Sequence, residues 1–173
     1  MTKRIPLYCL ASLLLAVGAS AAKTAWVPFS PKDGGFTVSA PGKLAYRPKN
    51  VPTSVGTVVS HGYALTHQGD AMMVHYGDYP ASVVAANPPE VFIDGVITNN
   101  VNGFHGTIKH ERPASLAGNP GRDAEIVLGK GGRFRTRVFM VGTRLYQIAV
   151  GTDRAQISAD GVKFLNSLTL TGK

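Results

Sequence analysis

Residues 129–150 decide the fold, and they read Gly-Lys-Gly-Gly-Arg-Phe-Arg-Thr-Arg-Val-Phe-Met-Val-Gly-Thr-Arg-Leu-Tyr-Gln-Ile-Ala-Val. Two runs in which apolar residues alternate with polar ones flank Gly142-Thr143, which indicates two strands joined by a tight turn. A glycine in the first position of a two-residue loop favours a type II′ turn. The predicted β-hairpin sets these residues opposite each other: Val141 and Arg144, Phe139 and Tyr146, Arg137 and Ile148.

Periodicity places further elements on both sides of this hairpin. Apolar residues after Asn87-Pro88-Pro89-Glu90 recur at helical spacing up to Gly103, and these four residues have the chemistry of a helix start, with Asn87 as the cap. Gly95 interrupts this predicted helix and indicates close packing at that point. Asp153 is expected to cap a second helix. Strands are predicted at residues 36–40, 57–66, 71–78, 107–112, 122–128 and 168–170.

The segment from Lys43 to Gly56 contains Pro48 and Pro52 and little apolar periodicity, which predicts a surface loop. After residue 22 the sequence has no internal repeat, low-complexity tract or linker. We therefore expect one domain over residues 23–173. That length is enough for a hydrophobic core that needs no disulfide.

The first 22 residues have the three parts of a secretory signal peptide. Lys3 and Arg4 form a positive start, and the apolar run from Leu7 to Val17 is too short to span a bilayer. Ala19-Ser20-Ala21 offers the small residues of a cleavage site. We expect a cleaved bacterial signal over residues 1–22 and a secreted or periplasmic protein. An uncleaved membrane anchor is the alternative.

Cysteine usage and charge limit the possible partners. The single cysteine, Cys9, lies inside the apolar part of the leader and lacks a lipobox, so the mature chain would have no disulfide, thiolate metal ligand or cysteine nucleophile. No second segment is long and apolar enough to be a transmembrane helix, so the mature protein is expected to be soluble. The net charge of +8 falls to +6 without Lys3 and Arg4. A basic exported chain without a nucleic-acid motif favours anionic envelope components or acidic proteins over nucleic acid.

Several stretches resemble exported bacterial proteins of the PsbP-like and DcrB-like families. They are 35–42 (Gly-Phe-Thr-Val-Ser-Ala-Pro-Gly), 116–122 (Leu-Ala-Gly-Asn-Pro-Gly-Arg), 132–147 within the hairpin, and 164–170 (Phe-Leu-Asn-Ser-Leu-Thr-Leu). The resemblance implies an α+β fold: a single-domain α/β/α sandwich with a mainly antiparallel central sheet flanked by helices. It also implies a non-catalytic accessory or binding protein. Photosynthetic members assist a manganese cluster at a membrane, but no motif here carries that role over.

A row of arginines is the first candidate binding surface. Arg133, Arg135 and Arg137 share one face of the predicted strand because side chains alternate with period two, and Arg144 joins that face across the turn. Arginines beside aromatic side chains can hold an anionic ligand or a lipid surface. The alternative is that the row lines a solvated sheet margin and masks an edge strand. Burial of neighbouring aromatic side chains would favour that alternative.

The histidines are the second candidate. His61 and His75 lie on neighbouring predicted strands, and with Asp70 or Asp78 they could bind zinc or copper. The sequence has no His-x-His or His-Glu-x-x-His spacing, and surface or strand histidines without a ligand are the favoured explanation.

No catalytic motif accompanies these residues. Gly-x-Ser-x-Gly and Ser-x-x-Lys are absent, and Ser60 and His61 are adjacent on a strand and so point to opposite faces. Asp123 and Glu125 share a strand face, but nearby arginines predict ion pairs rather than a catalytic carboxylate pair. Residues 129–132 fit a hairpin turn better than a phosphate-binding loop. We expect an exported, non-enzymatic accessory or binding module without a cofactor, and its ligand is not defined by the sequence.

Overall fold

The computed structural model describes residues 25–53 and 56–171, so the predicted signal peptide lies outside the described residues. Ten strands and three helices are described within these ranges. They are β1 (Val27–Phe29), β2 (Phe36–Ala40), β3 (Ala45–Thr53), β4 (Gly56–His67), β5 (Asp70–Asp78), α1 (Ala81–Ala86), α2 (Pro89–Gly103), β6 (Thr107–Leu116), β7 (Asn119–Val127), β8 (Arg133–Val141), β9 (Arg144–Thr152), α3 (Ala159–Leu165) and β10 (Thr169–Leu170).

Seven strands form one large sheet in the order β3-β4-β5-β9-β8-β7-β6, and every neighbouring pair is antiparallel. The connection through α1 and α2 carries the chain from β5 to the far edge at β6, and the later strands return until β9 pairs with β5. A small sheet, β1-β2-β10, joins the two ends of the domain. The expected antiparallel α+β architecture is confirmed.

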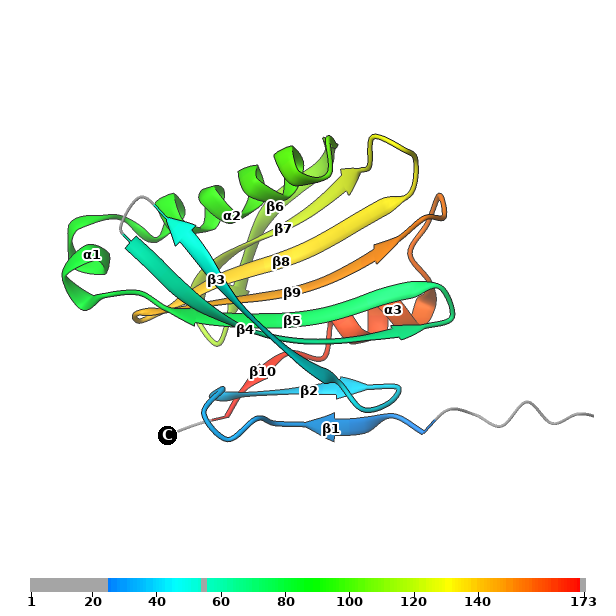
Figure 1. Ribbon diagram of the computed structural model, residues 1–173, viewed down its shortest axis with the longest axis horizontal. Helices are drawn as coiled ribbons and strands as arrows, with labels where there is room; N and C mark the ends of the chain where they lie inside the picture. Colours follow the sequence, from blue (N-terminus) through cyan, green and yellow to red (C-terminus); the bar gives the residue numbers. More distant parts are fainter. Residues whose placement is uncertain (1–24, 54–55, 172–173) are drawn as a thin grey trace, which may run out of the picture.

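Figure 1 shows α2 along one side of the large sheet, with α3 and the small sheet on the other side. The core is correspondingly in two layers. On the α3 side, Phe36 and Val38 of the small sheet pack with Phe164 against Met72 and Ile148 of the large sheet. On the α2 side, the helix contributes Phe92, Ile93 and Ile97, which pack on Ala124, Val138, Met140 and Leu145. Both faces of the central strands are therefore buried, as expected for a sheet covered on both sides.

The hairpin of β8 and β9 has the predicted register. Val141 pairs with Arg144, Phe139 with Tyr146 and Arg137 with Ile148. Gly142 has a φ of 57°, the left-handed value that the first position of this turn needs. Another glycine sets the distance between strands: a Cβ on Gly121 would lie 2.2 Å from Cδ1 of Phe139 and 2.5 Å from the Val138 carbonyl oxygen. Only glycine fits there without a shift of the backbone.

The prediction of a surface loop after Lys43 was wrong, because most of that segment forms β3 and pairs with β4 from Ala45 to Thr53. β3 is an edge strand, and an edge strand tolerates Pro48 and Pro52, which have no backbone N–H to donate to a neighbouring strand. The prolines and charged side chains that weaken the apolar pattern are the features that protect an exposed sheet edge from pairing with another chain.

The predicted helix caps were also wrong. Pro88 is the N-cap of α2 without a side-chain bond, and Asn87 instead ends α1 and donates its Nδ2 to the carbonyl of Val83. α3 begins after Ser158, whose Oγ accepts a bond from the Gly161 amide, so Asp153 is not the cap. The close packing expected at Gly95 is not present, since a Cβ there would meet no atom within 4 Å.

None of the helices in the described ranges is both long and apolar enough to cross a bilayer.

Candidate functional site

Two arginines of the row, Arg135 and Arg137, bind one buried carboxylate, Asp123. Arg135 donates from Nε and Nη2 to the two oxygens of Asp123, at 2.9 and 2.8 Å. Arg137 adds a bond from Nε at 3.2 Å, and Arg112 of β6 adds one from Nη2 at 2.9 Å. β7 lies between β6 and β8, so alternation brings these side chains from both neighbours to Asp123 on the α3 side of the sheet.

The carboxylate of Asp123 stays ionised inside the fold. Burial alone would raise its pKa, but the hydrogen bonds from Arg135 and Arg112 outweigh burial and lower the pKa to about 2. Arg133 sits beside Glu125, with Nε 3.4 Å from Oε1. The predicted ion pairing of both carboxylates is confirmed. The alternative that the arginines mask an edge strand is wrong, because β8 is an interior strand of the large sheet.

Arg144 belongs to a different cluster, at the end of the hairpin far from Arg133. It forms a two-bond ion pair with Asp78, at 2.6 and 2.7 Å, and donates from Nη1 to the carbonyl oxygens of Asp33 and Gly34. These bonds raise the pKa of Arg144 above its usual value. Its contacts attach the turn before β2 to the large sheet. The neighbouring aromatic side chains Phe139 and Tyr146 are buried, so the row does not present an exposed aromatic surface.

The structure does not bring the two candidate histidines together. His61 pairs with Tyr76 and His75 pairs with Gly62, so their side chains lie on opposite faces of the sheet. The His61 ring stacks on Tyr76 at 4.7 Å, and its Nδ1 lies 2.8 Å from the hydroxyl of Tyr46. Among the described residues, no group of three or more His, Cys, Asp or Glu side chains is placed to hold a metal ion.

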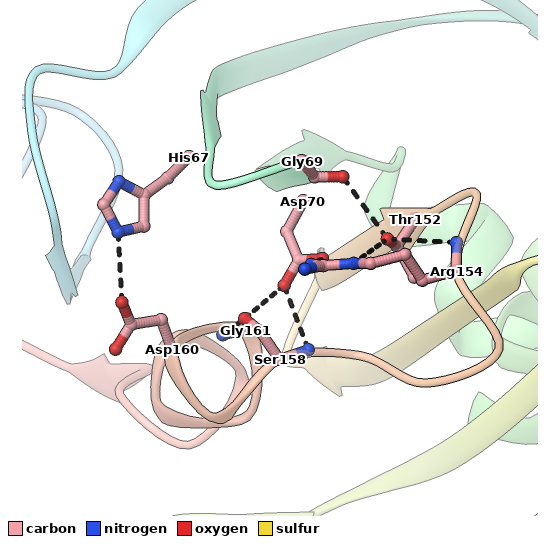
Figure 2. Close-up of polar contacts among 8 residues, drawn as sticks. All are labelled: His67, Gly69, Asp70, Thr152, Arg154, Ser158, Asp160 and Gly161. Carbon is pink, nitrogen blue, oxygen red and sulfur yellow. Dashed lines mark hydrogen bonds and ion pairs between the residues drawn. The ribbon is translucent and has the colours of Figure 1, made fainter.

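Asp70, the carboxylate expected near those histidines, instead holds α3 to the sheet (Figure 2). It is fully buried and accepts bonds from the Ser158 amide and hydroxyl and from Arg154. Burial alone would raise the pKa of Asp70, but the bonds from Ser158 and Arg154 outweigh it and lower the pKa. Figure 2 also shows His67 bonded to Asp160 at 3.0 Å. These contacts give the cluster a structural role.

A pocket between α2 and the sheet collects polar side chains that no sequence motif connects. We call it the helix–sheet pocket. It has a volume of about 250 Å³ and is lined by Lys49, Val51, Val58, Ser60, His75, Tyr76, Gly77, Tyr79, Val96, Asn99, Asn100, Leu145 and Gln147. The residues come from β3, β4, β5, α2, β9 and the segment after β5. They are far apart in the sequence. The only sign of the pocket in the sequence is a polar residue at a strand position that faces the helix.

The polar side chains of the helix–sheet pocket form a row across the sheet. Lys49 is opposite Ser60 in the strand register, and His75 is opposite Gln147. The Ser60 Oγ and the His75 Nδ1 are 3.4 Å apart, and the Gln147 amide donates to the buried hydroxyl of Thr136 at 3.0 Å. These contacts hold the side chains of Ser60, His75 and Gln147 in place.

Two features of the helix–sheet pocket favour a bound molecule. The Nδ2 of Asn100 is buried and has no hydrogen-bond partner, and such a donor costs about 1–3 kcal/mol when left unpaired. Burial, with a smaller contribution from the charge of Lys49, lowers the pKa of His75, so the ring is neutral at neutral pH. Perturbed ionisable groups and unpaired donors in a concave site are typical of binding sites.

A larger cleft of about 850 Å³ lies at the end of α2, between Phe104, the turn at Leu128–Gly131 and the strands β5 and β8. Met73 and Phe134 give it a mainly apolar floor. Its polar lining side chains are Thr66, His105, Lys130, Thr152 and Asp153, and the smaller helix–sheet pocket has more of them.

The architecture is a PsbP-like fold. The solution structure of cyanobacterial PsbP (CyanoP) from Synechocystis sp. PCC 6803 aligns with it at a TM-score of 0.56 and 11% sequence identity, over 91% of this chain and 99% of that one. The expected resemblance is thus confirmed at the level of the fold. No protein-family model matches the sequence, and no curated protein matches it.

Proposed function

We propose that this protein is an exported, non-catalytic binding module that holds a small ligand in the helix–sheet pocket. The observation that carries the proposal is the buried, unpaired Nδ2 of Asn100, a residue that lines a pocket together with Ser60, His75 and Gln147. Ligand pockets combine apolar walls with a few fixed polar groups in this way. The export part of the proposal rests on the leader at residues 1–22.

The same pocket gives reasons against catalysis. Ser60 and His75 are neighbours, but a serine nucleophile needs a base that a third group orients, and that group is usually a carboxylate. The lining of the helix–sheet pocket contains no Asp or Glu. A small volume, a neutral imidazole and a fixed amide are suited to hydrogen bonding with a bound molecule.

The proposal is tested by filling the pocket. Val96 projects from α2 into the lining, so Val96→Phe reduces the space. Val91→Phe is the matched control, because Val91 is on the same helix, is 53% exposed and does not line this pocket. A panel of small acids, amides, alcohols and sugars is screened by ligand-observed NMR. We expect compounds that bind the wild type and the Val91 variant and lose binding in the Val96 variant. A panel without binders, or binding unchanged in the Val96 variant, would reject the pocket.

A second candidate function, peripheral binding to anionic envelope surfaces, is favoured by the charge of three arginines of the row, Arg133, Arg135 and Arg137, together with Arg112 of β6. These four arginines outnumber their partners Asp123 and Glu125, and the side chain of Arg112 is 66% exposed. A groove of about 390 Å³ beside Arg112 and Arg135 is also lined by His110, Glu111, Asp123 and Glu125. Cationic clusters attract anionic lipid surfaces with a strength that falls as salt rises.

Arg112→Gln is the best test of this surface, because the Arg112 side chain is 66% exposed and makes one bond to Asp123, whereas Arg135 is 22% exposed and makes two. Arg47→Gln on the opposite edge strand is the control, since Arg47 is also an exposed cation. Sedimentation with vesicles containing anionic lipid should fall for the Arg112 variant and stay unchanged for the control. Equal sedimentation of both variants and the wild type would exclude the arginine row.

A further inference from the structure

We infer that the ligand of the helix–sheet pocket is a small monocarboxylic acid, bound as its anion with the carboxylate at the polar row and a short apolar body beyond it. The inference rests on the proposed function and adds the chemical class of the ligand. It is built from the order of the lining residues along the strands, their charges and the size of the pocket.

The lining is divided into a polar end and an apolar end. At one end, Lys49 lies opposite Ser60, and Ser60 contacts the ring of His75. Two residues further along the same strands, Val51 lies opposite Val58, so the lining changes from polar to apolar within one step of the pleat. Leu145, Tyr79 and Val96 complete the apolar end.

Gly77 brings β5 close to β4 at the apolar end. It lies opposite Leu145 in the sheet, and a Cβ on it would be 3.0 Å from Cγ1 of Val58 and 3.3 Å from the Val59 carbonyl oxygen. The apolar side chains around this end suit a short hydrocarbon group.

The polar end favours an anion. Lys49 supplies a positive charge at the pocket, and no carboxylate lines it. Asn100, a lining residue, has a buried Nδ2 donor without a partner, and the Ser60 hydroxyl lies beside the His75 ring. A carboxylate has only acceptor atoms in its ionised form and can accept from several donors at once. It satisfies the unpaired donor and pairs with the lysine.

The size of the site limits the ligand. Pockets for drug-sized molecules have volumes of about 300–1,000 Å³, and this one has about 250 Å³. One cation matches one carboxylate. A monocarboxylate with a short aliphatic chain fits the volume, the single charge and the two-ended lining together.

Three probes of similar size separate the ligand class from the existence of the site: butyrate, butanamide and butan-1-ol, each titrated into the isotope-labelled protein and followed by NMR. We expect butyrate to shift the signals of the lining residues saturably, and the two neutral probes to bind about tenfold more weakly because they do not pair with the lysine. Equal binding of butanamide and butyrate would overturn the anion inference and leave the pocket as a site. No binding by any probe, together with an empty screen, would overturn the proposed function as well.

Variants identify the groups that recognise the carboxylate. Asn100→Leu and Lys49→Met should each weaken butyrate binding, by about tenfold for the asparagine, while the weak binding of butan-1-ol changes little. Lys43→Met is the control, because Lys43 is exposed and lies outside the lining. Inorganic phosphate serves as an anion without an apolar body. Phosphate binding as tight as butyrate, or butyrate binding unaffected by both pocket variants, would overturn the inference.

Discussion

Replacing Asp123 by asparagine should destabilise the fold strongly, since its carboxylate accepts bonds from both Arg135 and Arg137. The Asp123 side chain is 5% exposed, and the two arginine side chains are each 22% exposed. Removing one partner of a buried ion pair costs about 3–5 kcal/mol because the other charges stay behind without compensation. The partial exposure of the arginines places the expected loss near the lower end, at about 3 kcal/mol of unfolding free energy.

The pKa of Asp123 gives an independent magnitude. It falls from an ordinary value of 3.8 to about 2 in the folded protein, and each unit corresponds to about 1.4 kcal/mol. The ionised carboxylate therefore contributes about 2 kcal/mol to stability at neutral pH. Because the folded pKa lies below the unfolded pKa, this contribution is complete above the unfolded value and is lost as the pH falls from about 4 to about 2.

The assay is urea unfolding followed by far-UV circular dichroism at a series of pH values. We expect Asp123→Asn to lose about 3 kcal/mol at pH 7 and to approach the wild type in stability as the solution is acidified toward pH 2. Arg112→Ala is the control, and its exposed side chain should cost less than about 1 kcal/mol. A loss below about 1 kcal/mol for Asp123→Asn, or a loss that does not depend on pH, would refute the buried-anion account.

Two further predictions concern the framework. Gly121→Ala should lower the unfolding free energy by about 1–3 kcal/mol because its Cβ would collide with Phe139 and with backbone. Gly95→Ala lies in open space on α2 and should raise the unfolding free energy by about 0.5–1 kcal/mol. Equal effects of the two substitutions in thermal melts would contradict the packing described. Ser158→Ala removes both the cap of α3 and a donor to buried Asp70, so it should cost about 1–3 kcal/mol, and unchanged hydrogen exchange in α3 would argue against that link.

The hairpin could be predicted from the sequence because its determinants are local. A glycine at the turn and alternating side chains fix the register of β8 against β9. The body of α2 was recognisable for the same reason, from proline at its start and glycine at its end. The ion pairs of Asp123 also followed from alternation, since arginines on the neighbouring strand had to share its face.

The rest depends on contacts between distant parts of the chain. β3 was missed because the prolines and charges that protect an edge strand also remove the apolar pattern of a strand. The cap of α3 was assigned to Asp153 because sequence spacing does not show that Ser158 is held by Asp70 of β5. The helix–sheet pocket could not be predicted, because its polar row joins residues from four elements that only the completed sheet and α2 bring together.

Intermolecular nuclear Overhauser effects between bound butyrate and the protein test the central claim most directly, since they report where the ligand lies. The helix–sheet pocket predicts contacts from the butyrate methyl group to the side chains of Val58, Val96 and Leu145, at the apolar end of the lining. Contacts to Met73 and Phe134 instead would place the ligand in the larger cleft at the end of α2 and contradict the account.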